Sequence, residues 1–176
     1  LGLIDCGNWS QSASWAVPTT AVSGVYIARL IRADNGGASH IVFVVRDDQT
    51  PSDILFKTSD ATWQAYNVYG GTSLYTGSTA FGNGHAVKVS YNRPFITRAG
   101  GGGGGASEDW LFNAEYPMIR WLERNGYNVE YTTDVDMEKT TTPITPDKCK
   151  VLLSVGHDEY WSANERFRFE EARNNG

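Results

Sequence analysis

Residues 151–161, Val-Leu-Leu-Ser-Val-Gly-His-Asp-Glu-Tyr-Trp, place three side chains capable of acid–base or metal chemistry directly after an apolar run. A short run of branched apolar residues that stops at a glycine is typical of a buried parallel strand. His157 and Glu159 then lie at the carboxyl end of that strand, where open α/β sheets bind ligands. An imidazole beside the carboxylates of Asp158 and Glu159 predicts proton transfer or metal ligation there. The alternative is an ordinary solvated turn, which Asp and His also favour.

A helix is expected immediately after this turn, and its start would define the end of the turn. Ser162 is a good N-cap, and Glu165 follows at the spacing of a capping box. Residues 163–173 contain neither Pro nor Gly. The pattern therefore predicts strand, turn and helix in direct succession.

The stretch before this unit also has helical and strand signals. Residues 107–125 carry apolar residues at helical spacing, and Pro117 inside the run either kinks the helix or opens a new first turn. Strands are expected at 128–132 and 151–155, with a connection of loop-plus-helix size between them. Helix, strand, crossover, strand and helix predict the opening of an α/β layer fold.

The first half of the chain follows a β pattern instead. Four runs alternate with turn-rich stretches, at 24–30, 40–46, 54–57 and 85–91. Residues 33–39 are expected to link the first two runs as a hairpin-like connection. The expected fold is mixed (α+β). An antiparallel β-sandwich-like part at 1–99 and a Gly-rich linker at 100–106 precede the first part of an α/β domain at 107–176. A chain that ends just after a helix C-cap is expected to be a fragment of a longer polypeptide.

The glycine run at 100–105 formally contains G-x-G-x-x-G and has two interpretations. A phosphate-binding loop would need a strand before it, and Pro94 disfavours a central strand there. Homopolymeric glycine matches any glycine pattern, and a flexible joint explains the composition more simply. Nucleotide binding is therefore the weakest of the functional hypotheses.

Composition excludes several classes of protein. The 176 residues are 40% hydrophobic and 12% aromatic, enough for a packed core. A net charge of -5 with scattered basic residues argues against a nucleic-acid partner. There is no apolar run of about 18 residues, so no membrane span is expected. Cys6 and Cys149 lack zinc-site spacing, and a single bridge between them remains open.

Three segments, in this order along the chain, carry a family resemblance. They are Thr-Trp-Gln-Ala-Tyr-Asn-Val-Tyr-Gly-Gly (62–71), Asn-Ala-Glu-Tyr-Pro-Met-Ile-Arg-Trp-Leu (113–122) and Ser-Val-Gly-His-Asp-Glu-Tyr-Trp (154–161). Together they resemble the large (beta) subunit of N,N-dimethylformamidase, and more closely bacterial proteins with that subunit's C-terminal domain. The resemblance runs from about Trp9 to the end.

The resemblance implies both a fold and an activity. The implied fold is a β-sandwich-like part packed on a class I glutamine amidotransferase-like, flavodoxin-like part. The implied activity is hydrolysis of a small, formamide-type amide at a mononuclear Fe(III) site held by two tyrosines and one glutamate. A glutamine amidotransferase would need a cysteine at its strand-to-helix turn, where this chain has residues 157–159 instead, so a cysteine nucleophile is not expected.

The resemblance also suggests residues for the site. Glu159 would be an iron ligand, and His157 its neighbour in the pocket and the group that shuttles the proton. Tyr66, in Gln-Ala-Tyr-Asn, would be one tyrosine ligand. Tyr26, in Ser-Gly-Val-Tyr-Ile, is chosen for the other on order and spacing. Two further tyrosines could replace either of them, Tyr69 or Tyr75. The family's remaining pocket residues would fall beyond Gly176.

A second hypothesis is a non-catalytic module of a large exported bacterial protein, with the sandwich binding carbohydrate or serving adhesion. Trp9, Trp15 and Trp63 in the β half are the residues that this hypothesis would use. The hydrolase hypothesis predicts a small amide as partner, together with further domains of the same polypeptide or a second copy of the chain. The resemblance favours an extracellular location, and the cytoplasm is the alternative.

Overall fold

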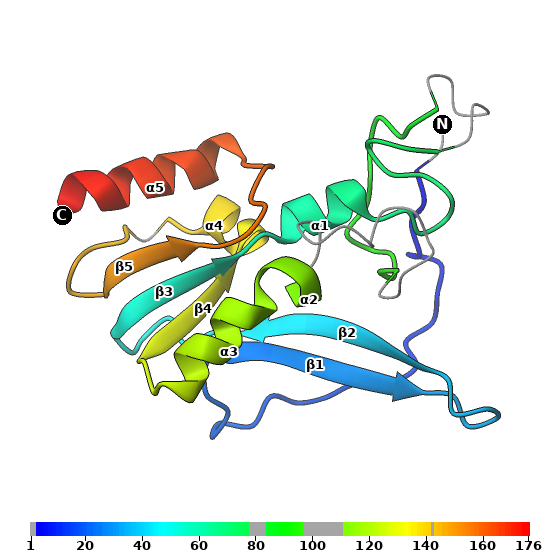
Figure 1. The fold of residues 1–176 in the computed structure, drawn as a ribbon, viewed down its shortest axis with the longest axis horizontal. Helices are drawn as coiled ribbons and strands as arrows, with labels where there is room; N and C mark the ends of the chain where they lie inside the picture. The colour runs from blue at the N-terminus through cyan, green and yellow to red at the C-terminus, as the bar shows by residue number, and fades with distance from the viewer. Residues whose placement is uncertain (1–2, 78–83, 97–110, 142) are drawn as a thin grey trace.

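The computed structural model describes residues 3–77, 84–96, 111–141 and 143–176. Within them, β1 (Gly24–Ile31) and β2 (Ala38–Val45) form an antiparallel sheet, and a second sheet is parallel with the order β4-β3-β5. The parallel strands are β3 (Ser52–Thr58), β4 (Val129–Thr133) and β5 (Cys149–Ser154). The helices are α1 (Asp60–Tyr66), α2 (Leu111–Ala114), α3 (Tyr116–Arg124), α4 (Asp134–Lys139) and α5 (Ala163–Asn175) (Figure 1).

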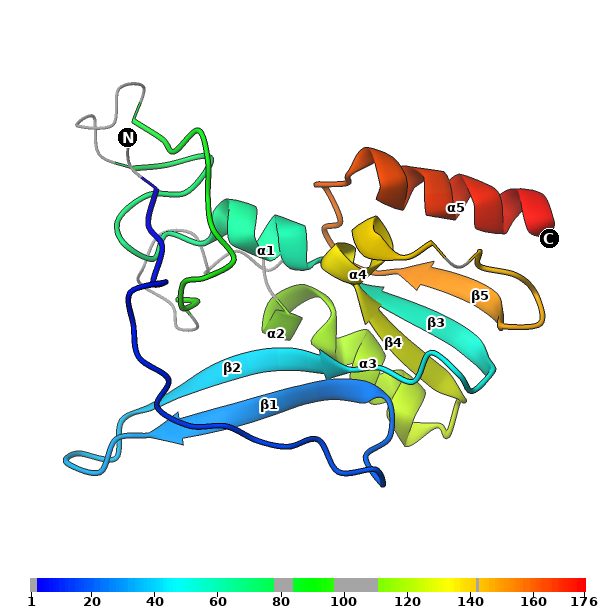
Figure 2. The ribbon, with the colours of Figure 1, turned by 180° about the vertical axis from the view of Figure 1, so that it is seen from behind.

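The parallel sheet is the middle layer of the fold. Helices α4 and α5 cover one face, while α3 and the β1–β2 ribbon lie on the other (Figures 1 and 2). Successive side chains of a strand point to opposite faces, so β3 supplies Phe56 to one core and Leu55 to the other. The first core contains Phe56, Trp63, Leu111, Ile119, Leu122 and Tyr131. The second contains Met137, Ile144 and Cys149, with Leu55, Leu152, Phe169 and Ala172 packed against them.

The register of the parallel sheet brings the ends of its strands to one edge. Thr58 of β3 pairs with Thr133 of β4, and Lys57 pairs with Ser154 of β5. Helix α1, helix α4 and the turn that leads to α5 therefore all start from the same edge of the sheet (Figure 1). This is the edge at which parallel α/β sheets place their ligands.

Several predicted elements are confirmed by the structure. Strands β1, β2, β4 and β5 lie where their sequence patterns predict, and residues between β1 and β2 form the expected reversal. Helix α5 begins after Ser162 with the capping box to Glu165. Pro117 lies in the first turn of α3, so it opens a new helix after α2 rather than bending a single one.

The expected antiparallel sandwich is wrong in two respects. Residues 54–57 belong to β3, which is the central strand of the parallel sheet. The reason is visible in Ile54, Leu55 and Phe56, a continuous apolar run that suits a strand covered on both faces. Residues 85–91 form no strand, and Val87 within them is exposed. What remains of the antiparallel part, among the described residues, is the β1–β2 ribbon.

Three further predictions concern features of the whole chain. The glycine run and the predicted linker lie outside the described residues, and the domain boundaries stay predictions. Cys6 and Cys149 are both free thiols, so the bridge left open is not formed. In the described part of the chain, none of the helices has the length and apolar character needed to cross a membrane.

A candidate metal and proton-transfer site

The turn after β5 is built around a glycine that packs against α2. Gly156 has a φ of +79°, in the left-handed region that favours glycine. A Cβ added there would lie 2.7 Å from the Cβ of Ala114. The close approach of these two segments therefore requires glycine at this position, directly before His157.

Helix α1 holds the other side of the turn through one buried hydroxyl. The Oγ1 atom of Thr62 accepts hydrogen bonds from the backbone N–H groups of Glu159 at 3.0 Å and Tyr160 at 3.2 Å. Thr62 is completely buried. Because α1 also carries Tyr66, these two bonds fix the distance between the tyrosine and Glu159.

Four side chains gather around the Glu159 carboxylate, and we call these five residues the Glu159 cluster. The hydroxyls of Tyr66 and Tyr75 both donate to Oε2 of Glu159, at 2.9 and 2.8 Å. Nε2 of His157 lies 3.2 Å from the same oxygen. The Tyr160 hydroxyl donates to the Tyr75 hydroxyl at 2.7 Å. A single carboxylate oxygen is thus the meeting point of two phenols and an imidazole.

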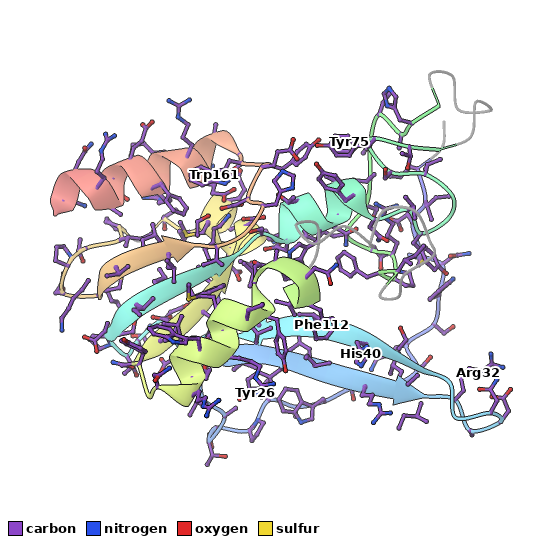
Figure 3. All side chains as sticks on the ribbon, in the orientation of Figure 1. Tyr26, Arg32, His40, Tyr75, Phe112 and Trp161 are labelled. Carbon is purple, nitrogen blue, oxygen red and sulfur yellow. The ribbon has the colours of Figure 1, made fainter. Side chains whose placement is uncertain are left out.

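Ring packing fixes the tyrosines of the cluster. The rings of Tyr66 and Tyr75 stack with their centroids 4.3 Å apart, and the His157 ring lies 5.4 Å from that of Tyr66. Figure 3 shows Tyr75 in the loop beyond α1, facing the turn that follows β5. The side chains of His157 and Glu159 are 31% and 40% exposed, so a small molecule can reach them.

Desolvation and hydrogen bonds hold Tyr75 in its neutral form. Partial desolvation of the hydroxyl and the hydrogen bond that it donates to Glu159 raise the pKa of Tyr75 above its usual value. A nearby metal cation would act in the opposite direction, because its charge favours the phenolate. The phenols of Tyr66 and Tyr75 therefore donate hydrogen bonds to Glu159, and a cation bound there would favour their anionic forms.

A buried lysine, Lys57, binds the turn that follows β5 through Asp158. Lys57 is fully buried, and its Nζ donates to Asp158 at 2.8 Å, to Glu165 at 2.6 Å and to Asp134. Burial alone would lower the pKa of Lys57, but the adjacent carboxylates of Asp134 and Asp158 raise it above its usual value. The three carboxylates are close enough together to hold a metal. The ammonium group already supplies the cation at their centre, so we assign them a structural role.

Arg93 holds the loop that brings Tyr75 back to α1. Arg93 is 6% exposed, and its guanidinium donates to the backbone carbonyls of Gln64 at 2.7 Å, and of Tyr69 and Thr72 at 3.2 Å each. These carbonyls belong to α1 and to the loop between Tyr66 and Tyr75. Arg93 therefore sets the path of the chain between the two phenols.

The donor set of the cluster fits a hard metal ion. Each phenol oxygen lies 2.8 or 2.9 Å from Oε2 of Glu159. Neighbouring ligands of an octahedral ion with bonds of about 2.0–2.1 Å are separated by about 2.8–3.0 Å. Phenolate and carboxylate are hard anionic oxygens that suit Fe(III). The two phenol–carboxylate distances are therefore compatible with neighbouring ligands of one ion.

The structure brings together Tyr66, His157 and Glu159 but not Tyr26. The Tyr26 hydroxyl donates to the carbonyl of Val22 at 3.0 Å, and its ring packs on Phe43. Figure 3 shows Tyr26 on β1, well apart from Tyr75. Tyr75, one of the two alternatives in the sequence, is the second tyrosine whose hydroxyl donates to Glu159. The other alternative, Tyr69, makes no side-chain hydrogen bond to the Glu159 cluster within the described residues.

Sequence reasoning missed Thr62, Arg93 and Tyr160. Tyr160 follows Glu159 directly, so its position next to a predicted site residue was a signal that could have identified it. Arg93 lies 21 to 29 residues from the carbonyls that it binds, and its sequence context has no feature that indicates this role.

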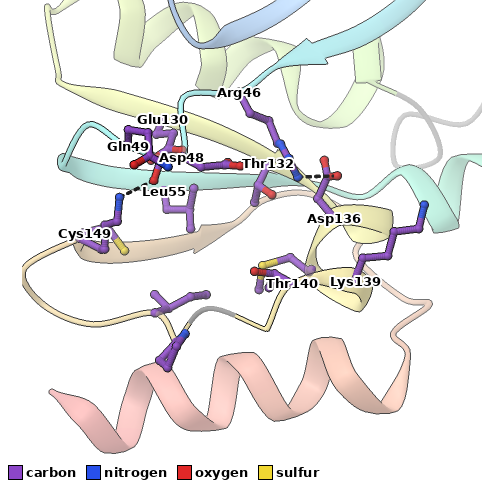
Figure 4. A pocket seen from close by; sticks show the side chains of 14 residues that line it. Arg46, Asp48, Gln49, Leu55, Glu130, Thr132, Asp136, Lys139, Thr140 and Cys149 are labelled. Atoms are coloured by element: carbon purple, nitrogen blue, oxygen red, sulfur yellow. Dashed lines mark hydrogen bonds and ion pairs between the residues drawn. The ribbon is translucent and has the colours of Figure 1, made fainter.

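Cavities also lie elsewhere in the described part of the molecule. One of about 550 Å³ is lined by residues of β3, β4, β5 and α4, and the Arg46–Asp136 ion pair, at 2.6 Å, forms part of its wall (Figure 4). Burial raises the pKa of Glu130 in its wall to about 7. A more apolar cavity of about 750 Å³ lies between β2 and α1. Among the residues described, no member of the Glu159 cluster lines either cavity.

The fold and the site define an α/β protein with a carboxylate–phenol cluster at the carboxyl edge of its parallel strands. The chain belongs to the family described as N,N-dimethylformamidase beta subunit-like, C-terminal, whose family model matches residues 1–176. No curated protein matches the sequence. Membership confirms the resemblance carried by the three sequence segments.

Proposed function

We propose that this chain is part of an iron-dependent amide hydrolase of the N,N-dimethylformamidase type. The observation that carries the proposal is the convergence of two phenols, Tyr66 and Tyr75, on one oxygen of Glu159. The family supports a dimethylformamidase-related role. A mononuclear Fe(III) ion would be held by the oxygens of Tyr66, Tyr75 and Glu159, three hard donors that leave room for further ligands.

The proposed second tyrosine ligand is Tyr75 rather than Tyr26. Order and spacing in the sequence favour Tyr26, whose hydroxyl is bonded to a carbonyl of its own segment. Tyr75 stacks on Tyr66 and donates to the same carboxylate oxygen. It therefore needs no rearrangement of the backbone to take the role.

The residues of the chain would divide the work of amide hydrolysis among them. When bound, Fe(III) would supply a Lewis acid that polarises the amide carbonyl and makes water more acidic. His157, 3.2 Å from Glu159 and partly exposed, would carry a proton to the departing amine. Packing of Tyr66 between Tyr75 and His157 would hold the imidazole beside the carboxylate. The exposure of the cluster suits a small amide as substrate.

The relation to the class I glutamine amidotransferase fold is also a proposal. A parallel sheet with helices on both faces supports it. The turn after β5 carries His157 and Glu159 in place of a nucleophilic cysteine, and the two cysteines lie at other places. A shared fold would therefore come with different chemistry.

Iron content and the visible spectrum test the proposal. The wild-type chain, reconstituted with iron, is expected to bind close to one equivalent and to show a tyrosinate-to-iron charge-transfer band. Tyr75→Phe should lose about half of the band, because one of two phenolates is removed, and Glu159→Ala should lose the metal. Tyr26→Phe is the matched control and should leave the spectrum unchanged.

Two results would contradict the proposal. A wild-type protein without iron after reconstitution would remove the metal site. If Tyr26→Phe weakened the charge-transfer band and Tyr75→Phe did not, the second tyrosine ligand would be Tyr26. If iron binds, hydrolysis of small formamides is the activity to measure, with amine release as the readout.

A further inference from the structure

The hydroxyl of Tyr160 makes one hydrogen bond within the Glu159 cluster, and its direction is defined. Tyr75 uses its own proton to donate to Glu159, so the Tyr160 hydroxyl is the donor in the 2.7 Å bond between the two phenols. The two rings meet edge to face, with centroids 6.3 Å apart. Tyr160 is therefore one hydrogen bond removed from Glu159.

We propose that Tyr160 is a positioning residue that tunes the Tyr75 ligand by donating a hydrogen bond to its phenolic oxygen. This inference rests on the proposed iron site and goes beyond it, because it assigns a role to a residue outside the ligand set. A phenol oxygen that binds a cation has lost its own proton but can still accept a hydrogen bond. A bond to an ionised oxygen is stronger than one between neutral groups.

The backbone holds Tyr160 in place for this role. Its N–H and that of Glu159 both donate to Oγ1 of the buried Thr62. The carboxylate and the donor are thus adjacent residues on one turn, fixed to α1 at a single atom. The geometry of donor, phenol and carboxylate is set before any ion binds, which is how residues around a metal ligand tune it.

The hydrogen bond has two measurable consequences. Donation to the phenolate lowers the energy of its lone pairs, which raises the energy of the transition that transfers charge to iron. Removing the donor should then move the band to longer wavelength while leaving its intensity. Partners of this kind typically change metal affinity by about 10- to 100-fold when they are removed.

The test compares Tyr160→Phe with the wild type, each reconstituted with iron, by visible spectroscopy and iron titration. We expect about one equivalent of iron in both, a band shifted to longer wavelength in the variant, and an affinity about 10-fold weaker. Tyr69→Phe is the matched control, because it removes a hydroxyl from the neighbouring loop and should leave both quantities unchanged. Far-UV circular dichroism establishes that each variant is folded.

The outcomes separate this inference from the function on which it rests. Wild-type protein that binds iron with the band, beside a Tyr160→Phe variant with unchanged band position and affinity, would overturn the role of Tyr160 alone. Loss of half the band intensity in Tyr160→Phe would make Tyr160 itself a ligand and also overturn the inference. A wild-type chain that binds no iron would overturn both proposals.

Discussion

Replacing Lys57 by methionine should destabilise the fold strongly and in a pH-dependent manner. The ammonium is completely buried and donates to the carboxylates of Asp134, Asp158 and Glu165. Methionine fills a similar volume but leaves three buried carboxylates without their cation. Breaking a buried ion pair from one side costs about 3–5 kcal/mol. With an m-value of about 2 kcal/mol/M, the urea midpoint should fall by about 2 M.

The pH dependence follows from the carboxylates that the substitution leaves behind. Burial already raises the pKa of Asp134, and Lys57 opposes that rise. Without the ammonium the folded-state pKa of Asp134 increases further, while in the unfolded chain it stays near 4. The folded variant then binds more protons than its unfolded form, so its stability falls as the pH rises from about 5 to 8. The deficit relative to wild type should be smallest at pH 5.

The assay is urea unfolding of wild type and variant at pH 5, 6.5 and 8. Lys150→Met is the matched control, since Lys150 is 73% exposed and pairs with Asp53 at the surface. Exposed pairs contribute about 0–1 kcal/mol, so this control should differ little from wild type at any pH. Equal losses in the two variants, or a loss at Lys57 that is the same at pH 5 and pH 8, would refute the reasoning.

Two further predictions concern the turn and its surroundings. Gly156→Ala forces a Cβ to 2.7 Å from that of Ala114 at a φ of +79°, and should cost about 1–3 kcal/mol in thermal unfolding. Gly126→Ala, with a φ of +71° and open space, should cost less, and an equal loss would show that the contact is unimportant. Burial raises the pKa of Glu115 to about 8, against a usual 4.5, although its Oε1 accepts from the N–H of Ser59. This carboxyl lowers stability as the pH rises from about 4.5 to 8, so Glu115→Gln should be more stable than wild type at pH 9, by up to about 5 kcal/mol. Parallel stability curves from pH 5 to pH 9 would contradict that assignment.

The elements that the sequence identifies best are those whose signals are local. The capping box of Ser162 and Glu165 predicts the start of α5 because both hydrogen bonds are made within one turn. The apolar run before Gly156 predicts β5 in the same way. Local chemistry decides these structures, so no knowledge of distant contacts was needed.

The pairing partners of a strand are harder to predict from local sequence, as β3 shows. Its apolar run predicts a strand, but nothing in residues 54–57 states whether the neighbours are parallel or antiparallel. Those neighbours, β4 and β5, lie 75 or more residues later in the chain. The continuous rather than alternating apolar pattern was the available signal for a strand covered on both faces.

The residues of the candidate site also differ in whether local sequence signals predict them. His157 and Glu159 follow from a strand end and a glycine, and Tyr66 from the resemblance. The second tyrosine depends on how a loop of irregular structure returns to α1, and Arg93 decides that by binding three backbone carbonyls. Spacing along the sequence carries no information about such a return. Tyr26 and Tyr75 were therefore distinguishable only once the loop was placed.

One arrangement connects the buried charges with the exposed cluster. Asp158 points down to Lys57, while its neighbours His157 and Glu159 meet at the surface with Tyr66. The side chain of Asp158 thus faces the buried network that joins the ends of three strands. The side chains of His157 and Glu159 face solvent. A flexible turn could not keep two phenols within hydrogen-bond distance of one carboxylate oxygen. The buried network therefore fixes the turn and holds the Glu159 cluster in the arrangement that the proposed metal site requires.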